Sequence, residues 1–133
     1  MVIKWDVTIP PLSGEKTRRG YVYLPENYDR EPDKRYPVLY MFDGHNVFFD
    51  SDATYGKSWG LKDFLDHWDR RLIMVGIECG HEGEERLSEY LPYPADKKSH
   101  FANFEPKGDE TMQWILSEVK PLIDMEYRTI PFR

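Results

Sequence analysis

The chain has little cysteine, no long apolar run and less positive than negative charge. Cys79 is the one cysteine among 133 residues, which excludes an intrachain disulfide framework. Residues 1–11 carry Lys4 and Asp6 and lack the apolar core of a signal peptide, and no run is long enough to span a membrane. From these absences we expect a cytoplasmic protein without a membrane partner.

The charge balance excludes a second class of partner. Asp and Glu number 24 against 18 Lys and Arg, so the formal net charge is −6. An acidic surface repels the phosphates of nucleic acids, and no nucleic-acid partner is expected. Aromatic residues make up 15% of the chain and supply large buried areas, so a real core is possible. The length then suits one globular domain over residues 1–133.

Four segments have the patterns of β-strands. Residues 2–9 and 19–24 mix β-branched and polar residues on either side of a turn rich in proline and glycine, which predicts a hairpin. Residues 36–42 and 72–77 are continuous apolar runs. Such runs are typical of strands buried on both faces, in a sheet that helices cover.

Two segments have apolar residues at helical spacing, 61–68 and 110–125. A helix between the two apolar strands makes a right-handed crossover, so those strands should be parallel. The order of elements predicts an α/β fold, the opening part of a three-layer α/β/α sandwich with an N-terminal hairpin followed by parallel strands. The sandwich is expected to be incomplete, because a further strand normally follows the last helix.

Six short motifs occur in order along residues 21–129. They are 22–28 (Val-Tyr-Leu-Pro-Glu-Asn-Tyr), 36–44 with Asn46 and Phe48, Tyr55-Gly56 with Trp59, 75–78, Arg86 with 89–92, and 118–124 followed by Tyr127-Arg-Thr. Together they resemble the Putative esterase family of α/β-hydrolases, which includes esterase D-type, enterochelin and feruloyl esterases. The resemblance implies a serine esterase that hydrolyses a small ester through an acyl-enzyme without a cofactor.

The resemblance also implies where the nucleophile should lie. In this family a strand and the Gly-x-Ser-x-Gly elbow follow the Tyr-Arg-Thr element, and the acid and histidine come later. This sequence ends four residues after Thr129. We therefore expect a chain truncated before its catalytic serine, acid and histidine, and inactive by itself. The alternative is a non-catalytic α/β domain that forms homo-oligomers through an exposed sheet edge.

By the same resemblance, the turn after the first apolar run forms part of an oxyanion hole. Gly44 would let the backbone bend and the N–H of His45 would be the donor. Asn46, Tyr90 and Tyr93 are expected near the substrate, because open α/β sheets bind ligands beyond the carboxyl ends of their strands. A plain strand-to-loop turn is the alternative.

One stretch imitates the nucleophile elbow. Residues 56–60 read Gly-Lys-Ser-Trp-Gly. An elbow directly follows a buried strand, whereas residues 49–55 are polar and turn-like, so Ser58 is interpreted as a loop serine or helix cap. A small complete enzyme that acts through Ser58, with Asp96 and His100 in chain order, is the remaining catalytic alternative.

No metal-ligand spacing is visible among the histidines, so no metal is expected; they are His45, His67, His81 and His100. Cys79 ends an apolar strand and is interpreted as a small buried hydrophobe. Arg86 and Glu89 are expected to form a partly buried salt bridge that pins their loop.

Overall fold

The computed structural model describes residues 1–94, 96–98 and 105–131. Within these residues the centre is a four-stranded sheet in the order β1-β2-β4-β3. Its strands are β1 (Val2–Thr8), β2 (Thr17–Tyr23), β3 (Val38–Met41) and β4 (Ile73–Ile77). β2 pairs antiparallel with both β1 and β4, whereas β3 and β4 are parallel. The predicted hairpin and the predicted parallel pair are both confirmed.

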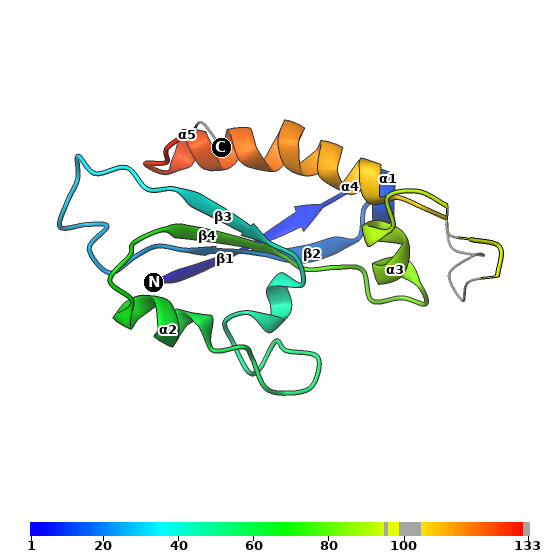
Figure 1. Cartoon of the computed structure of the whole chain (residues 1–133), viewed down its shortest axis with the longest axis horizontal. Helices are drawn as coiled ribbons and strands as arrows, with labels where there is room; N and C mark the ends of the chain where they lie inside the picture. The colour runs from blue at the N-terminus through cyan, green and yellow to red at the C-terminus, as the bar shows by residue number, and fades with distance from the viewer. Residues whose placement is uncertain (95, 99–104, 132–133) are drawn as a thin grey trace.

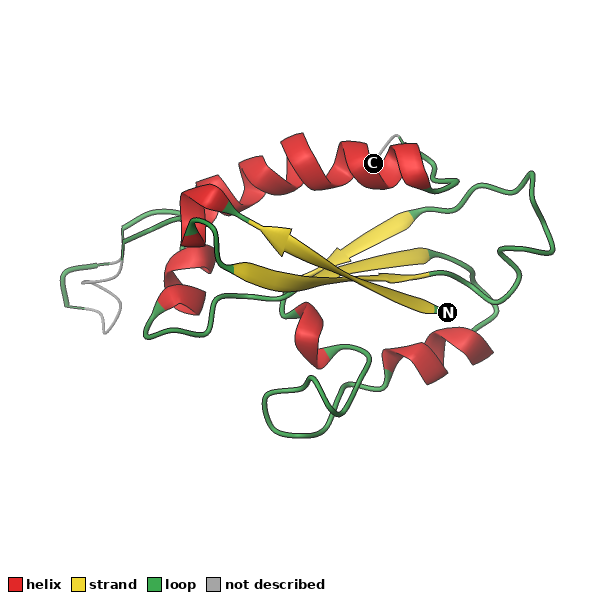
Figure 2. Cartoon of the chain, turned by 180° about the vertical axis from the view of Figure 1, so that it is seen from behind, coloured by secondary structure: helices red, strands yellow, loops and turns green. Residues whose placement is uncertain are grey.

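Helices lie on both faces of the sheet (Figure 1; Figure 2). On one face are α2 (Leu61–His67), which connects β3 to β4, and the short helical turn η1 (Gly44–Asn46). On the other face a long helix runs without interruption through α4 (Gly108–Trp114), η2 (Ile115–Val119) and α5 (Lys120–Glu126). The arrangement is the predicted three-layer α/β/α sandwich.

Two short helices stand where the sequence predicted a turn and a loop. α1 (Pro10–Ser13) follows β1, and α3 (Glu85–Tyr90) follows β4. A helix of one or two turns is too short to show apolar periodicity, so the pattern could not reveal either of them. α3 packs against α4, and the N–H of Gly108 donates to the carbonyl of Leu91 at 2.8 Å.

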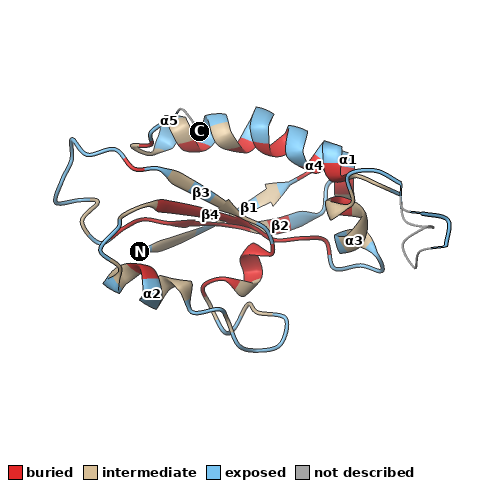
Figure 3. Cartoon of the chain, viewed as in Figure 1, coloured by how far each residue is buried: buried red, intermediate tan, exposed pale blue. Residues whose placement is uncertain are grey.

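A hydrophobic cluster lies on each face of the sheet. β4 separates them and is buried throughout, as the second apolar run predicted (Figure 3). The cluster under the long helix contains Ile9, Leu12, Val22, Leu24, Tyr36, Ile73, Val75, Ile77, Trp114, Ile115, Val119 and Ile123. The cluster under α2 and η1 contains Tyr21, Tyr23, Val47, Phe48, Leu65 and Met74.

β3 is an edge strand in the described part of the chain, so the prediction that it is buried on both faces is wrong. Leu39 and Phe42 are 44% and 48% exposed. A neighbour reaches only the start of this run, where the N–H of Tyr36 donates to Arg128 and the N–H of Ile130 donates to Tyr36. An apolar run indicates that a strand can be buried. Burial of β3 would also need a further strand paired with its open edge.

The long helix departs from the predicted pattern in two ways. Residues 115–119 form a π-helical turn just before Pro121, whose ring has no N–H and would clash with the carbonyl four residues earlier in a regular α-helix. The helix therefore continues through Pro121. In its apolar stripe, Ile115, Val119 and Ile123 are buried, whereas Met112, Leu116 and Leu122 are exposed. Among the described residues, no helix combines the length and apolar character that a membrane crossing requires.

Candidate functional site

The turn that follows β3 is held by an ionic contact with α3. Asp43 has a left-handed backbone, with φ of 53°, which is unusual for a residue with a Cβ atom. Its carboxylate accepts hydrogen bonds from Arg86 Nε at 3.0 Å and Nη2 at 2.7 Å. The Tyr90 hydroxyl donates to the carboxylate at 3.0 Å and accepts the Asp43 N–H at 3.2 Å. The two α3 side chains thus fix an otherwise unfavourable turn.

The Asp43 carboxylate is ionised at neutral pH. Burial by itself would raise its pKa, but the hydrogen bonds from Arg86 and Tyr90 outweigh burial and the pKa is lowered. An ionised carboxylate makes shorter and stronger hydrogen bonds than a neutral acid. The turn after β3 is therefore clamped by charge.

The predicted salt bridge between Arg86 and Glu89 is wrong. Arg86 pairs with Asp43, and Glu89 forms a buried bidentate pair with Arg18, with N–O distances of 2.8 and 3.0 Å. Glu89 also accepts the N–H of Gly80 at 3.0 Å. Asp43 and Arg18, which are distant from α3 in the sequence, each offer two-point geometry, which an i,i+3 pair on one short helix does not.

Gly44 is required for the close packing of the turn on β4. A Cβ atom on Gly44 would lie 2.4 Å from the Gly76 carbonyl carbon and 2.5 Å from the Ile77 nitrogen. The positive φ of this turn belongs to Asp43, and Gly44, which has no Cβ atom, lets η1 rest directly on the β4 backbone.

Two backbone donors at the start of η1 have no acceptor among the described residues. The N–H groups of Asn46 and Val47 donate to Asp43 and Gly44 at 2.9 and 3.2 Å. The N–H groups of Gly44 and His45 make no hydrogen bond within the described residues, as is usual for the first turn of a helix. Both residues are buried at the carboxyl end of β3, so this end of the sheet presents free donors.

The other predicted residues near the substrate differ in their surroundings. Asn46 accepts the N–H of Thr54 on its side chain at 3.0 Å and the N–H of Trp59 on its carbonyl at 2.8 Å, which closes the loop before α2. The Tyr90 hydroxyl donates its hydrogen bond to Asp43, and Tyr93 is 70% exposed. Asn46 and Tyr90 thus hold the turn region together, and a place near the substrate stays a prediction for Asn46, Tyr90 and Tyr93.

Ser58 lies in a loop, as predicted. Its N–H donates to Asp50 at 2.8 Å and its hydroxyl accepts the N–H of Gly60 at 3.2 Å, and among the described residues no histidine forms a hydrogen bond with it. The residue that caps α2 is Gly60, which rules out the capping role for Ser58. His100, which the catalytic alternative needs, lies outside the described residues.

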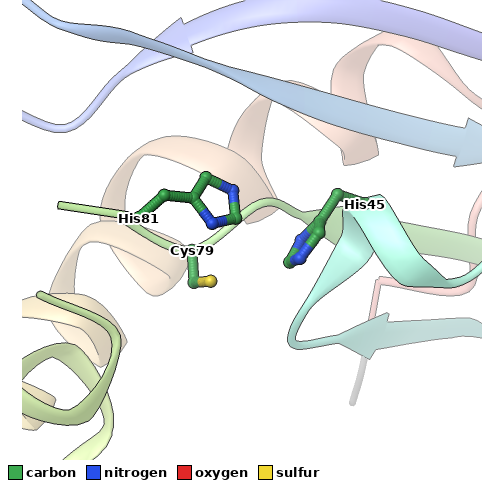
Figure 4. A group of neighbouring side chains, drawn as sticks. All are labelled: His45, Cys79 and His81. Carbon is green, nitrogen blue, oxygen red and sulfur yellow. The ribbon is translucent and has the colours of Figure 1, made fainter. Parts of the chain in front are cut away.

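The fold brings together three residues that the sequence left apart. His45, Cys79 and His81 each place one potential ligand atom within 4.8 Å of the others, and Figure 4 shows their side chains turned toward one another. The two imidazole rings are edge to face, with centroids 4.7 Å apart. Cys79 is buried as predicted, and burial, with nearby Asp43, raises the pKa of its thiol to about 12. Burial, with nearby His81, lowers the pKa of His45, which is therefore neutral at pH 7.

The position of this group could have been inferred from the strand order. Cys79 and His81 follow β4 and His45 follows β3, and the ends of adjacent parallel strands meet at one edge of a sheet. The closeness of these three residues depends on the pairing of segments that are distant in the sequence. The spacing of ligands within one segment therefore cannot reveal it.

Comparisons with known proteins identify the family of the chain. Residues 13–132 match the family described as Putative esterase. A relative from Bacillus subtilis (strain 168), described as uncharacterized protein YbbA, is 29% identical over 108 residues, which are 80% of this chain and 39% of that protein.

Two solved structures share the fold. The BES protein from Bacillus cereus superposes with a TM-score of 0.70 at 20% identity, over 96% of this chain and 49% of that one. The IroE-like serine hydrolase from Shewanella oneidensis has a TM-score of 0.68 at 22% identity, over 97% of this chain and 40% of that one. This chain thus spans less than half the length of each relative. It belongs to the Putative esterase family of carboxylic-ester hydrolases and has the fold of the N-terminal region of an α/β-hydrolase.

Proposed function

We propose that this chain supplies the oxyanion-binding part of a serine carboxylic-ester hydrolase that acts on a small ester. The observation that carries the proposal is the pair of free N–H donors at Gly44 and His45, on a turn clamped by Asp43. When a serine attacks an ester carbonyl, the C=O electrons move to oxygen and a tetrahedral oxyanion forms. Donors fixed before the reaction stabilise that charge without reorganisation.

In this proposal the nucleophile comes from outside residues 1–133, and the chain by itself does not hydrolyse esters. Two observations support it: among the described residues no histidine forms a hydrogen bond with Ser58, and the chain spans 39–49% of the relatives it matches. A segment that completes the site would supply the serine, the acid and the histidine, in the order that α/β-hydrolases use.

A hydrolysis assay tests whether the chain lacks its own nucleophile. We expect no turnover of p-nitrophenyl acetate above background, and no covalent labelling by a fluorophosphonate, in the unmodified chain and in Ser58→Ala alike. Ser51→Ala is the matched control, since Ser51 is an exposed serine of the same loop. Activity that Ser58→Ala removes and Ser51→Ala retains would identify Ser58 as the nucleophile and refute the proposal.

A chimera tests the oxyanion role directly. This chain would replace the matching part of the Shewanella oneidensis serine hydrolase, with which it shares the fold. His45→Ala keeps the backbone donor and should retain ester hydrolysis, whereas His45→Pro removes it and should lower kcat by about 100-fold. Proline suits the first turn of a helix, so the fold should survive, and circular dichroism checks this. Equal activity in the two variants would exclude His45 as the donor.

The second candidate is a self-associating domain without catalysis. It is favoured by the open edge of β3 and by a groove of about 420 Å³ between β3 and the long helix, lined by apolar residues that include Met41, Phe42, Met112 and Leu116. Exposed edges of this kind pair with other strands. A mass in solution that rises with concentration, and falls to the monomer in Leu39→Lys, supports this candidate, whereas a monomer at every concentration excludes it.

A further inference from the structure

We propose that His45, Cys79 and His81 form a binding site for one Zn²⁺ ion. The site holds two imidazoles and one sulfur, a donor set that zinc prefers and that Mg²⁺ and Ca²⁺ avoid. The inference does not depend on the proposed ester hydrolysis. It depends on the contacts that each of the three side chains makes with its surroundings.

His45 presents an unused nitrogen inside the protein. The residue is 3% exposed, and its Nε2 lies 3.0 Å from the Thr54 hydroxyl oxygen. Its Nδ1 is buried and has no hydrogen-bond partner among the described residues. When Nε2–H donates to Thr54, the Nδ1 lone pair is free. A buried nitrogen without a partner is costly, and coordination to a cation would satisfy it.

His81 is held in the way that metal-binding histidines usually are. Its Nε2 lies 2.8 Å from Glu78 Oε2, and that carboxylate is anchored by Arg19 Nη2 at 2.7 Å. A carboxylate that accepts one ring N–H orients the imidazole and leaves the other nitrogen as the ligand. The His81 side chain is 50% exposed, so an ion can enter from solvent on this side.

Cys79 supplies the third ligand atom. Metal binding breaks its S–H bond, the proton passes to solvent and the sulfur lone pair forms the S–Zn bond. With Zn–N near 2.1 Å and Zn–S near 2.3 Å, tetrahedral ligand atoms lie roughly 3.5 Å apart. The present ligand atoms lie within 4.8 Å of one another, so a movement of about 1 Å closes the site, and the half-exposed His81 ring can provide it. A water molecule would fill the fourth position.

The decisive measurement uses the unmodified 133-residue chain, without a histidine tag and stripped of metal. Calorimetric titration with ZnCl₂ should give one site per chain, and MgCl₂ should give none. Titration with CoCl₂ should produce a sulfur-to-cobalt charge-transfer band, which reports Cys79 alone because the chain has no other cysteine. Absence of zinc binding by the folded chain, or a cobalt spectrum without that band, would overturn the proposal.

Variants locate the ion. His81→Gln and Cys79→Ser should each weaken zinc binding by at least tenfold, because each loses one ligand, whereas His67→Gln should bind like the parent chain. His67 is the matched control, since it is exposed on α2 and its Nδ1 contacts the carbonyl of Asp63. His81 is exposed as well, so its replacement should leave the fold intact. Unchanged affinity in both ligand variants would place the ion elsewhere and refute the site.

Discussion

Gly44 and Gly76 meet through their backbones, so the turn after β3 rests directly on β4. A Cβ atom on Gly76 would lie 2.9 Å from the Gly44 Cα, and one on Gly44 would lie 2.4 Å from the Gly76 carbonyl carbon. This contact sets the height of η1 above the sheet. It therefore also sets where the free N–H of His45 and the His45 ring lie relative to the end of β4.

Gly44→Ala should destabilise the chain by about 3 kcal/mol, because the new methyl group meets rigid backbone and the core has no space to yield. Gly14→Ala is the control: its methyl group would meet nothing within 4 Å, and only the positive φ of 61° opposes it, at a cost of about 1 kcal/mol. Urea unfolding followed by circular dichroism gives both values. Equal losses would mean that η1 can lift away from β4.

Tyr90→Phe should destabilise the turn more than Arg86→Gln does. Loss of the hydroxyl leaves the N–H of buried Asp43 without an acceptor, which costs about 1–3 kcal/mol. Arg86 is half exposed, and loss of its ion pair should cost about 1 kcal/mol or less. Faster hydrogen exchange at the Asn46 and Val47 amides would report the loosened turn.

The control for this series is Tyr93→Phe, because Tyr93 is 70% exposed. Its free energy of unfolding should stay within about 0.5 kcal/mol of the parent chain. If Tyr90→Phe is equally harmless, the hydroxyl does not hold the turn.

Removal of one partner from the Arg18–Glu89 pair should cost about 3–5 kcal/mol, because the side chains are 6% and 3% exposed and the remaining charge would stay buried. The double replacement Arg18→Met with Glu89→Met should cost much less than the sum of the single replacements. A double-mutant cycle in urea measures the coupling. Simple additivity would contradict a coupled pair.

Asp66 should contribute to acid lability. Burial alone raises the pKa of its carboxyl, but hydrogen bonds from Lys62 at 2.8 Å and from the Tyr23 hydroxyl at 2.7 Å outweigh burial, and the pKa is lowered. A lowered folded-state pKa gives stability that is present above the unfolded value of about 3.9 and is lost as the pH falls through the folded-state pKa.

Asp66→Asn should therefore lower stability at pH 7 and reduce the further loss of stability between pH 4 and pH 2. Asp63→Asn, an exposed position on the same helix, should change neither quantity. Urea unfolding at pH 7, 4 and 2 compares the three chains. If Asp66→Asn loses as much stability between pH 4 and pH 2 as the parent chain does, the pH dependence belongs to other carboxylates.

Local patterns along the chain were enough to predict most of the elements. The hairpin, the parallel pair around α2, and the long helix follow from apolar periodicity and turn residues, which are properties of neighbouring positions. The family follows from motif order, whereas the turn at Gly44 as a candidate site stays a prediction. The predictions of the elements succeeded because each depends on residues close together in the sequence.

Tertiary structure alone decided the rest. Arg86 forms its salt bridge with Asp43 and not with Glu89, and β3 is an edge strand in the described part of the chain. The His45 side chain lies close to those of Cys79 and His81. Each outcome depends on which distant segments pack side by side, which is set by the total free energy of the fold and by no local pattern. The sequence by itself determined most of the elements and the family, whereas the packing of distant segments determined which side chains share the end of the sheet.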